Sequence, residues 1–251
     1  MERSYTYAVT ATMTNSRMLV LAAITRRRLA AVIHRYPCEP QRGRPWSCSL
    51  AERILITCAA LRTNLTFREL AASFAISKSA AHRIVSTMTP RLAALSAENG
   101  PGDRRESWVV DGTLIPTRDH RRAAQILIRR RDLLVVATTA GGPGNRNDPV
   151  HYRGSAIESR CKHHGRVLAD GAYRGIPELI TPVFRGNQIL RDRGWRRHRR
   201  RRARVEHAIA RLKNWRTLRD HRRRGCHLAD TLQAVAFLHN LHLDELRDTF
   251  S

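Results

Sequence analysis

The chain has 251 residues, enough for one large domain or two smaller ones with buried cores, which excludes a peptide hormone or a linker. Its 46 basic residues outnumber 21 acidic ones and give a net charge of +25, carried almost wholly by arginine. Because arginine pairs with phosphate oxygens and 42% of the residues are hydrophobic, we expect a folded nucleic-acid-binding protein rather than a disordered basic tail. Acidic small substrates and anionic membranes are the weaker alternatives.

The five cysteines are widely spaced, without the short pairs of zinc or redox motifs. We therefore expect reduced, mostly structural thiols. The apolar run at residues 18–24 is too short to span a bilayer and lacks the flanks of a signal peptide. A cytoplasmic protein with no membrane partner is the expectation.

The first 45 residues are the least informative part of the chain. Residues 14–35 have a helical apolar rhythm interrupted by three arginines, and Pro37 and Pro40 would end any helix that reached them. The role of residues 1–45 stays open.

Three helices are predicted next. Apolar residues recur at helical spacing from Leu50 to about Arg62. Thr66 and Glu69 form the pattern of a capping box, which predicts a second helix from Phe67 to Phe74. Ser77 is a suitable cap for a third helix that runs to about Met88.

The second and third of these helices, joined by a short turn, match a helix-turn-helix. The exposed face of the third helix would contact DNA through Lys78, Ser79, His82 and Arg83. An ordinary three-helix bundle is the alternative. Ala75 counts against DNA reading, because the turn often needs a positive φ, at a cost of about 1 kcal/mol for alanine.

The polar, glycine-rich segment 96–106 is the expected linker between a helical region, 1–95, and an α/β domain, 107–251. In the second region strands are predicted at 107–115, 125–129, 133–139, 166–169 and 179–184. Helices are predicted from Pro149 to about Cys161 and over 199–220 and 228–247, and residues 141–144 are expected to form a flexible turn. The fold class is therefore α/β, preceded by an all-α helix-turn-helix region.

Three carboxylates on separate elements indicate a divalent-metal site. Asp111 belongs to the first strand and Asp170 directly follows another, where ligands of α/β sheets gather. Glu206 lies on a helix within the most arginine-rich stretch of the chain. Oxygen ligands of this kind suit magnesium, and two such ions can activate an attacking oxygen and stabilise a leaving one.

Glu206 shares one helix face with Arg202 and Lys213, which would hold the phosphates of a bound strand. The adjoining apolar stripe would dock this helix on the sheet; it consists of Val205, Ala208, Ile209 and Leu212. Alternatively, Glu206 is only an ion-pair partner of Arg202, four residues away, worth a few tenths of a kcal/mol. Asp148, followed by Pro149, is more simply a helix N-cap, and any other role for it stays open.

Together these motifs resemble the Asp-Asp-Glu transposases of bacterial insertion sequences, the DDE superfamily endonucleases, and most closely the group related to insertion sequence five. The motifs are Val109-Val110-Asp111-Gly112-Thr113, Leu168-Ala169-Asp170-Gly171-Ala172-Tyr173, and Arg202-Ala203-Arg204-Val205-Glu206 with Lys213. The resemblance extends from about residue 46 to 243, including the helix-turn-helix and residues 143–148.

The resemblance implies an RNase H-like mixed sheet with flanking helices. It also implies two magnesium ions, with Mn²⁺ as a substitute, held by the catalytic triad Asp111, Asp170 and Glu206. Water would attack a phosphodiester at the element's end, and the released 3′-hydroxyl would attack target DNA. The implied partners are double-stranded DNA, as terminal inverted repeats and target, and a second copy of the chain in a homodimer on DNA. The implied location is the bacterial cytoplasm, in association with the nucleoid.

Two departures from the family pattern support other hypotheses. Arg199 stands where many relatives have a tyrosine, and the segment between Asp111 and Leu133 looks short, with residues 126–129 leaving little length for a second strand. An inactive, internally deleted transposase or a non-catalytic DNA-binding regulator is therefore the rival interpretation. An RNA-processing nuclease on the same fold is a third, which the helix-turn-helix disfavours.

Overall fold

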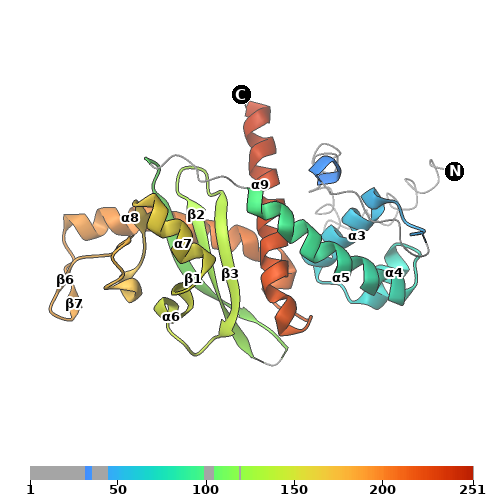
Figure 1. Cartoon of the computed structure of the whole chain (residues 1–251), viewed down its shortest axis with the longest axis horizontal. Coiled ribbons are helices and arrows are strands. Elements are labelled where there is room, and N and C mark those ends of the chain that lie inside the picture. The colour runs from blue at the N-terminus through green and yellow to red at the C-terminus, as the bar shows by residue number, and fades with distance from the viewer. Residues whose placement is uncertain (1–31, 36–44, 99–104, 119, 251) are drawn as a thin grey trace.

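The computed structural model describes residues 32–35, 45–98, 105–118 and 120–250. An N-terminal group of helices and an α/β layer lie on either side of one long helix, α9 (Leu228–Phe250) (Figure 1). The helical rhythm predicted for residues 14–35 falls outside the described residues, except for a short helical piece at 32–35.

The N-terminal group consists of α3 (Leu50–Thr63), α4 (Phe67–Ser73) and α5 (Lys78–Ala94). Local caps determine where the last two begin. The Thr66 hydroxyl accepts a hydrogen bond from the Glu69 N–H, and the Glu69 carboxylate accepts one from the Thr66 N–H. The Ser77 hydroxyl accepts from the Ala80 N–H at 3.0 Å. Both predicted helix starts are confirmed, although α5 continues past its predicted end to Ala94.

The turn between α4 and α5 has the geometry that the sequence predicted. Ala75 adopts a φ of 50°, in the left-handed region that costs alanine about 1 kcal/mol. The apolar side of this pair of helices is buried, with Leu70, Ile84 and Val85 almost completely inaccessible. The opposite side of α5 is solvent-exposed, and it presents Lys78, Ser79, His82 and Arg83.

The α/β domain contains a five-stranded mixed sheet in the order β3-β2-β1-β4-β5. Its strands are β1 (Trp108–Pro116), β2 (Arg121–Arg129), β3 (Val135–Pro143), β4 (Val167–Leu168) and β5 (Leu179–Ile180). The first three form an antiparallel meander, and β4 pairs parallel to β1. This arrangement matches the predicted RNase H-like α/β class.

The expectation that the segment between Asp111 and Leu133 leaves little length for a second strand is wrong. β2 has 9 residues and pairs with β1 along its whole length. The strand begins several residues before its predicted start, because arginines and alanines at 121–124 hide its signal. Residues 141–144 are likewise not a flexible turn: β3 continues to Pro143, and Gly141, with a φ of 106°, absorbs a bulge in the pairing.

The remaining elements differ from the predictions mainly in their ends. The helix expected over 149–161 is two helices, α6 (Asp148–Tyr152) and α7 (Ala156–His164). The strand expected over 179–184 divides into β5 and a separate hairpin of β6 (Phe184–Arg185) and β7 (Gln188–Ile189). The helix expected over 199–220 is α8 (Arg193–Lys213), which begins at its cap Asp192.

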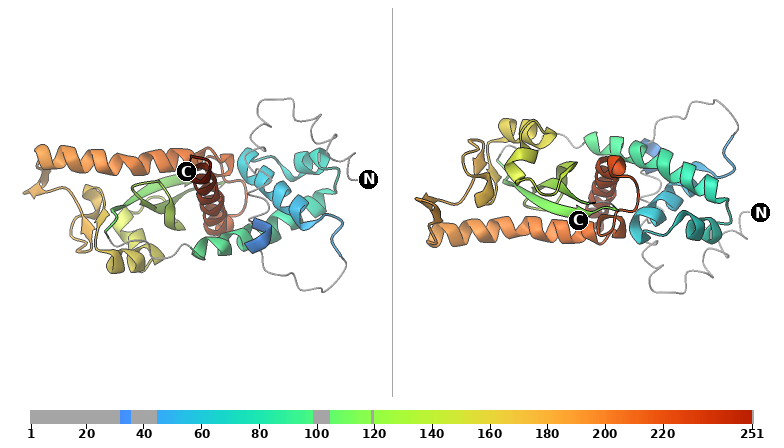
Figure 2. Two further views of the ribbon diagram at one scale, coloured as in Figure 1. Left: turned by 90° about the horizontal axis from the view of Figure 1, so that it is seen from above. Right: turned by 90° about the horizontal axis from the view of Figure 1, so that it is seen from below.

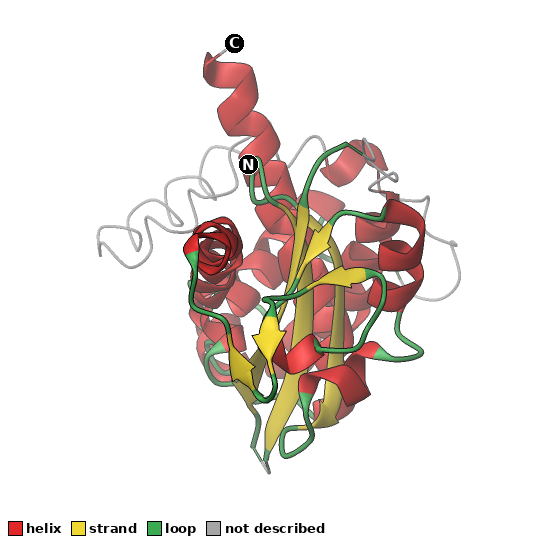
Figure 3. Cartoon of the chain, turned by 90° about the vertical axis from the view of Figure 1, so that its left-hand side faces the viewer, coloured by secondary structure: helices red, strands yellow, loops and turns green. Residues whose placement is uncertain are grey.

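Helices cover both faces of the sheet (Figure 3). On one face Val205, Ala208 and Leu212 of α8 pack with Val109 and other strand residues, which confirms the predicted docking stripe. The same hydrophobic core continues through α9 into the N-terminal helices. On the other face α6 and α7 form a second core with Trp108, Val110 and Val167. The site described next lies at the edge between these two cores.

Candidate metal and DNA site

The pairing of β1 with β4 brings Asp111 and Asp170 together. Trp108 lies opposite Val167 and Val109 lies opposite Leu168 in this parallel pair. Two residues beyond the end of this pairing, Asp111 and Asp170 lie close enough for the charge of Asp170 to act on Asp111. Both then face the α8 side of the sheet, because side chains alternate along a strand and Val109 and Leu168 belong to the core on that side.

The environment of Asp111 disfavours its charged form. Burial raises the pKa of Asp111 from 3.8 to about 6, and the neighbouring charge of Asp170 adds to the rise, although the Arg202 guanidinium opposes it. Asp170 is half-buried and uses one oxygen to accept a hydrogen bond from the Ala172 N–H at 2.9 Å. Two neighbouring carboxylates that repel each other form an electrostatic site for a cation.

Asp148 approaches the same edge from the opposite face of the sheet. A Cβ on Gly112 would lie only 2.3 Å from the Asp148 Oδ1, so the absence of a side chain at Gly112 makes room for this carboxylate. Burial and then the charge of Asp170 raise the pKa of Asp148. The prediction that Asp148 caps a helix is wrong: Asn147 is the N-cap residue of α6, and Asp148 is its first helical residue.

Gln125 and Tyr173 support this third carboxylate from behind. The Gln125 Nε2 donates to the Asp148 backbone carbonyl at 2.7 Å and to the Tyr173 hydroxyl at 2.8 Å. Burial, followed by the charges of Asp148, Asp111 and Asp170, raises the pKa of Tyr173, so the phenol stays protonated beside them. The sequence carried two signals for this cluster: Gln125 is the one polar residue in the otherwise apolar stretch 123–128, and Tyr173 belongs to the Asp170 motif.

Glu206 reaches the aspartates only through Arg202. One guanidinium nitrogen of Arg202 contacts the Asp111 Oδ2 at 2.8 Å, and the other contacts the Glu206 Oε1 at 3.2 Å. The Glu206 side chain is 62% exposed, whereas that of Asp111 is 14% exposed. The ion pair between Glu206 and Arg202 that the sequence suggested as an alternative role is therefore present, and Arg202 also binds Asp111 rather than pointing outward.

No set of three acidic, histidine or cysteine side chains lies close enough to hold a metal ion as the described residues stand. The fit of a divalent cation rests instead on the donor chemistry. Asp111 and Asp170 offer hard oxygen ligands that repel each other, a repulsion that Arg202 offsets only in part, and Asp148 adds to it. Glu206 could complete the set only if Arg202 leaves its position between the two carboxylates.

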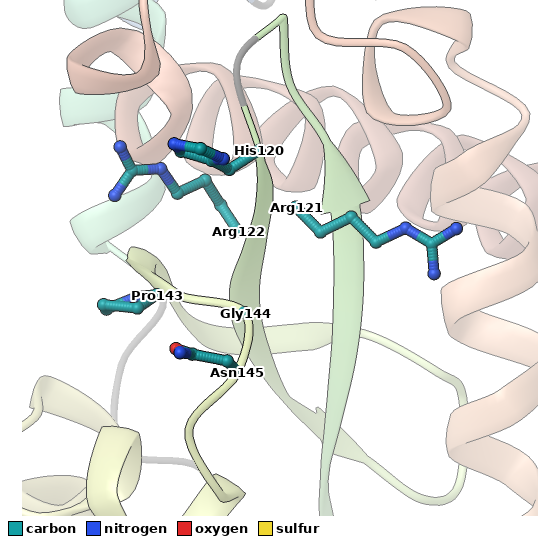
Figure 4. Close-up of a pocket in the computed structure, with 6 residues that line it drawn as sticks. All are labelled: His120, Arg121, Arg122, Pro143, Gly144 and Asn145. Atoms are coloured by element: carbon teal, nitrogen blue, oxygen red, sulfur yellow. The ribbon is translucent and has the colours of Figure 1, made fainter.

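The other residues predicted to contact DNA lie in two separate parts of the structure, at the end of α8 and on α5. Lys213, at the end of α8, is half-buried and its Nζ lies 3.4 Å from the Leu114 carbonyl on β1. The four α5 residues are on the helix-turn-helix surface; among them Arg83 stacks over Trp46 and His82 meets Phe67 edge-on. Separately, a pocket of about 560 Å³ lies near the ends of β2 and β3 (Figure 4). It is lined by His120, Arg121, Arg122, Pro143, Gly144 and Asn145, and contains none of the carboxylates.

Two family models match the chain in the order of its two regions. Residues 46–98 match the helix-turn-helix of DDE superfamily endonuclease, and residues 117–240 match DDE superfamily endonuclease. The chain is also 38% identical over 237 residues to a candidate transposase for insertion sequence element IS112 of Streptomyces albus G. This alignment covers 86% of the chain and 90% of the relative. The chain belongs to the DDE superfamily endonucleases.

The endonuclease match contains Asp148, Asp170 and Glu206 but begins after Asp111. The helix-turn-helix predicted from the capping pattern is confirmed by its own family model. No solved structure matches the chain. Among the described helices of this DDE endonuclease, none is both long and apolar enough to cross a membrane.

Proposed function

We propose that this DDE endonuclease is a transposase of the group related to insertion sequence five. It binds the terminal inverted repeats of its element through the helix-turn-helix, then cleaves DNA and joins it to a target. The single observation that carries the proposal is the adjacency of Asp111, on β1, and Asp170, just after the parallel strand β4, in a DDE endonuclease of net charge +25. A homodimer on DNA is part of the proposal, because two ends must be held together.

Asp111 and Asp170 would hold two magnesium ions together with Glu206, and Mn²⁺ would substitute. These ions supply Lewis-acid activation of the attacking oxygen and stabilisation of the leaving oxygen. The residues of the chain prepare the site for them. Burial raises the pKa of Asp111. Gln125, through its hydrogen bonds to the Asp148 carbonyl and the Tyr173 hydroxyl, holds the backbone around Asp148 in place.

Arg202 has two roles in this proposal. In the described structure it neutralises Asp111 and Glu206 at once. Asp111 and Glu206 would no longer need Arg202 for neutralisation if they held cations, and its guanidinium would then be free to bind a phosphate oxygen of the DNA strand. Lys213 contacts the same backbone. Binding of cations and binding of DNA are therefore coupled through one side chain.

The rival function is DNA binding without catalysis, as a regulator or an inactive remnant. The nine-residue β2 gives no support to an internal deletion. Arg199, at the position where many relatives have a tyrosine, still favours the rival function. An RNA-processing nuclease is less compatible with a helix-turn-helix, because the deep major groove of A-form RNA does not admit a helix.

Metal-dependent nicking of duplexes that carry the inverted repeats flanking the gene tests the proposal. Asp170→Asn should lower nicking by roughly a thousandfold, because it removes several kcal/mol of charge stabilisation, while DNA affinity stays within about threefold. The double variant Lys78→Ala with Arg83→Ala should affect DNA binding and spare nicking. It should weaken binding at least roughly tenfold and leave nicking at saturating DNA unchanged. Nicking retained by Asp170→Asn would contradict the assignment, and binding without nicking by the native chain would favour the rival.

A further inference from the structure

The N-terminal half of α8 is unlike the half that carries Glu206. All the buried residues of this helix, Val205, Ala208 and Leu212, lie in its C-terminal half. The N-terminal half, 193–201, buries none, and it extends beside the β6–β7 hairpin past the end of the sheet (Figure 2). His198 holds this half to the body of the protein through a contact of 2.8 Å between its Nε2 and the Ala169 carbonyl, but burial does not explain why the half is so basic.

Four exposed arginines follow one another on the solvent side of this half. Arg193, Arg196, Arg197 and Arg200, called here the outer row, are separated by intervals of three and four residues. At 100° per residue they lie within about 100° of one another around the helix axis. Arg202 and Glu206 lie about 170° and 130° from the centre of the row. The outer row thus faces away from the carboxylate site.

The charges of the outer row are not neutralised by the protein. Within the described part of the chain, the ion pairs of α8 involve Arg202, and the Arg204 guanidinium binds the carbonyls of residues 130 and 131. None of the four row arginines has an ion pair there. Like charges three and four residues apart destabilise a helix by a few tenths of a kcal/mol per pair, and cations near its N-terminus also oppose the helix dipole. The row therefore destabilises the free protein.

A polyanion would relieve this repulsion along the whole row. From Arg193 to Arg200 the helix rises by about 10 Å, which corresponds to about three phosphates along one strand of duplex DNA. The row cannot reach the strand at Asp111, because a helix with its side chains is about 10–12 Å wide and the row lies on its far side. A strand bound by Arg202 and a strand bound by the row belong to different stretches of nucleic acid.

We propose that the outer row of α8 binds a second DNA duplex, separate from the duplex held by the helix-turn-helix and the carboxylate site. One chain then contacts two duplexes, one on each side of α8. The inference rests on the proposed function, because it takes that function's DNA as the ligand on both sides.

The test counts duplexes per chain. Labelled 20-base-pair duplex DNA of random sequence is titrated into the full-length protein at low salt, well above its dissociation constant. The native chain should bind two duplexes per chain, whether or not it dimerises. Replacing all four row residues with glutamine should reduce this to one. The second binding event of the native chain should have a salt slope of roughly three, about 0.9 for each of about three phosphate contacts, and this event should be absent from the glutamine variant.

A lysine variant at the same four positions is the matched control, since it keeps the charge and similar helix propensity. It should still bind two duplexes. Two duplexes on the glutamine variant with an unchanged salt slope would overturn the proposal, as would a preference of the row for double-stranded RNA of equal length. Nicking separates this result from the main proposal: the glutamine variant should nick a short repeat duplex at the native rate. A native chain that binds two duplexes but never nicks would contradict the catalytic function alone.

Discussion

The helix-turn-helix and the carboxylate site are built by interactions of different range. Thr66 and Glu69, three residues apart, are enough to start α4, and Ser77 is enough to start α5. Asp111 and Asp170 meet only because β1 and β4 pair in parallel, with the intervening meander and helices in place. Damage to the first region should therefore be local and small, whereas single changes at the second should remove a function.

The largest effect is expected at Glu206, in the carboxylate site, where a single change should abolish one function and spare the other. Glu206→Gln should lower metal-dependent nicking by roughly a thousandfold, because it removes an oxygen ligand of the proposed site. Binding of DNA by the helix-turn-helix should be unchanged. Gel-based nicking and fluorescence anisotropy measure the two properties on the same duplex.

A purely structural role of Glu206 makes a different prediction. An exposed ion pair four residues apart on a helix is worth about 0.3–0.5 kcal/mol, so its loss would alter stability slightly and leave nicking intact. Normal nicking by Glu206→Gln would thus show that Glu206 serves only as an ion-pair partner of Arg202.

The next effect concerns α9, which joins the two regions. Burial lowers the pKa of His239 from 6.5 to about 4, partly offset by its hydrogen bond to the Leu133 carbonyl. Because this folded-state pKa lies below the unfolded value, the unfolded chain binds the proton more readily. The stability that the neutral, buried His239 side chain contributes is therefore fully present above about pH 6.5 and is lost as the pH falls toward 4.

This loss should amount to about 3 kcal/mol of unfolding free energy. Urea denaturation between pH 7 and pH 4 measures it, with His239→Gln as the comparison, since glutamine can keep the hydrogen bond without titrating. The variant should lose less stability over this range than the native chain. Parallel pH profiles for the two proteins would show that His239 is not the group responsible.

The smallest effects are expected for two alanine-to-glycine changes in the helix-turn-helix, which should alter the stability of the protein in opposite directions. Ala75→Gly should stabilise the protein by up to about 1 kcal/mol, because Ala75 has a positive φ of 50°. Ala72→Gly, three residues earlier and exposed in α4, should destabilise it by a similar amount. Thermal unfolding of the two variants gives the comparison directly, and equal shifts would contradict the geometry of the turn.

Sequence patterns predicted the parts of the fold that depend on neighbours in the chain. The caps of α4 and α5, the turn at Ala75 and the docking stripe of α8 are all of this kind. The errors occurred where tertiary pairing overrides local propensity. β2 extends into a polar segment because β1 offers it a partner along its whole length, and β3 tolerates glycines because Gly141 forms a bulge.

The site was predicted in part for a related reason. Asp111 and Asp170 could be placed at strand ends from apolar runs alone, but their shared face depends on a register that no local pattern specifies. The sequence predicts a helix cap at Asp148 because Pro149 follows it directly, whereas its contact with Gly112 depends on the fold. The position of Arg202 between Asp111 and Glu206 also required the packing of α8 on the sheet.

The central claim is that Asp111 and Asp170 form a divalent-cation site, and calorimetric titration of the full-length protein with Mn²⁺ tests it most directly. The native chain should bind Mn²⁺ with a heat that Asp111→Asn and Asp170→Asn each remove or weaken at least roughly tenfold, because each loses a charged oxygen ligand. Arg202→Lys, which keeps the positive charge, should still bind the ion. Equal Mn²⁺ affinity in the native chain and both aspartate variants would contradict the claim.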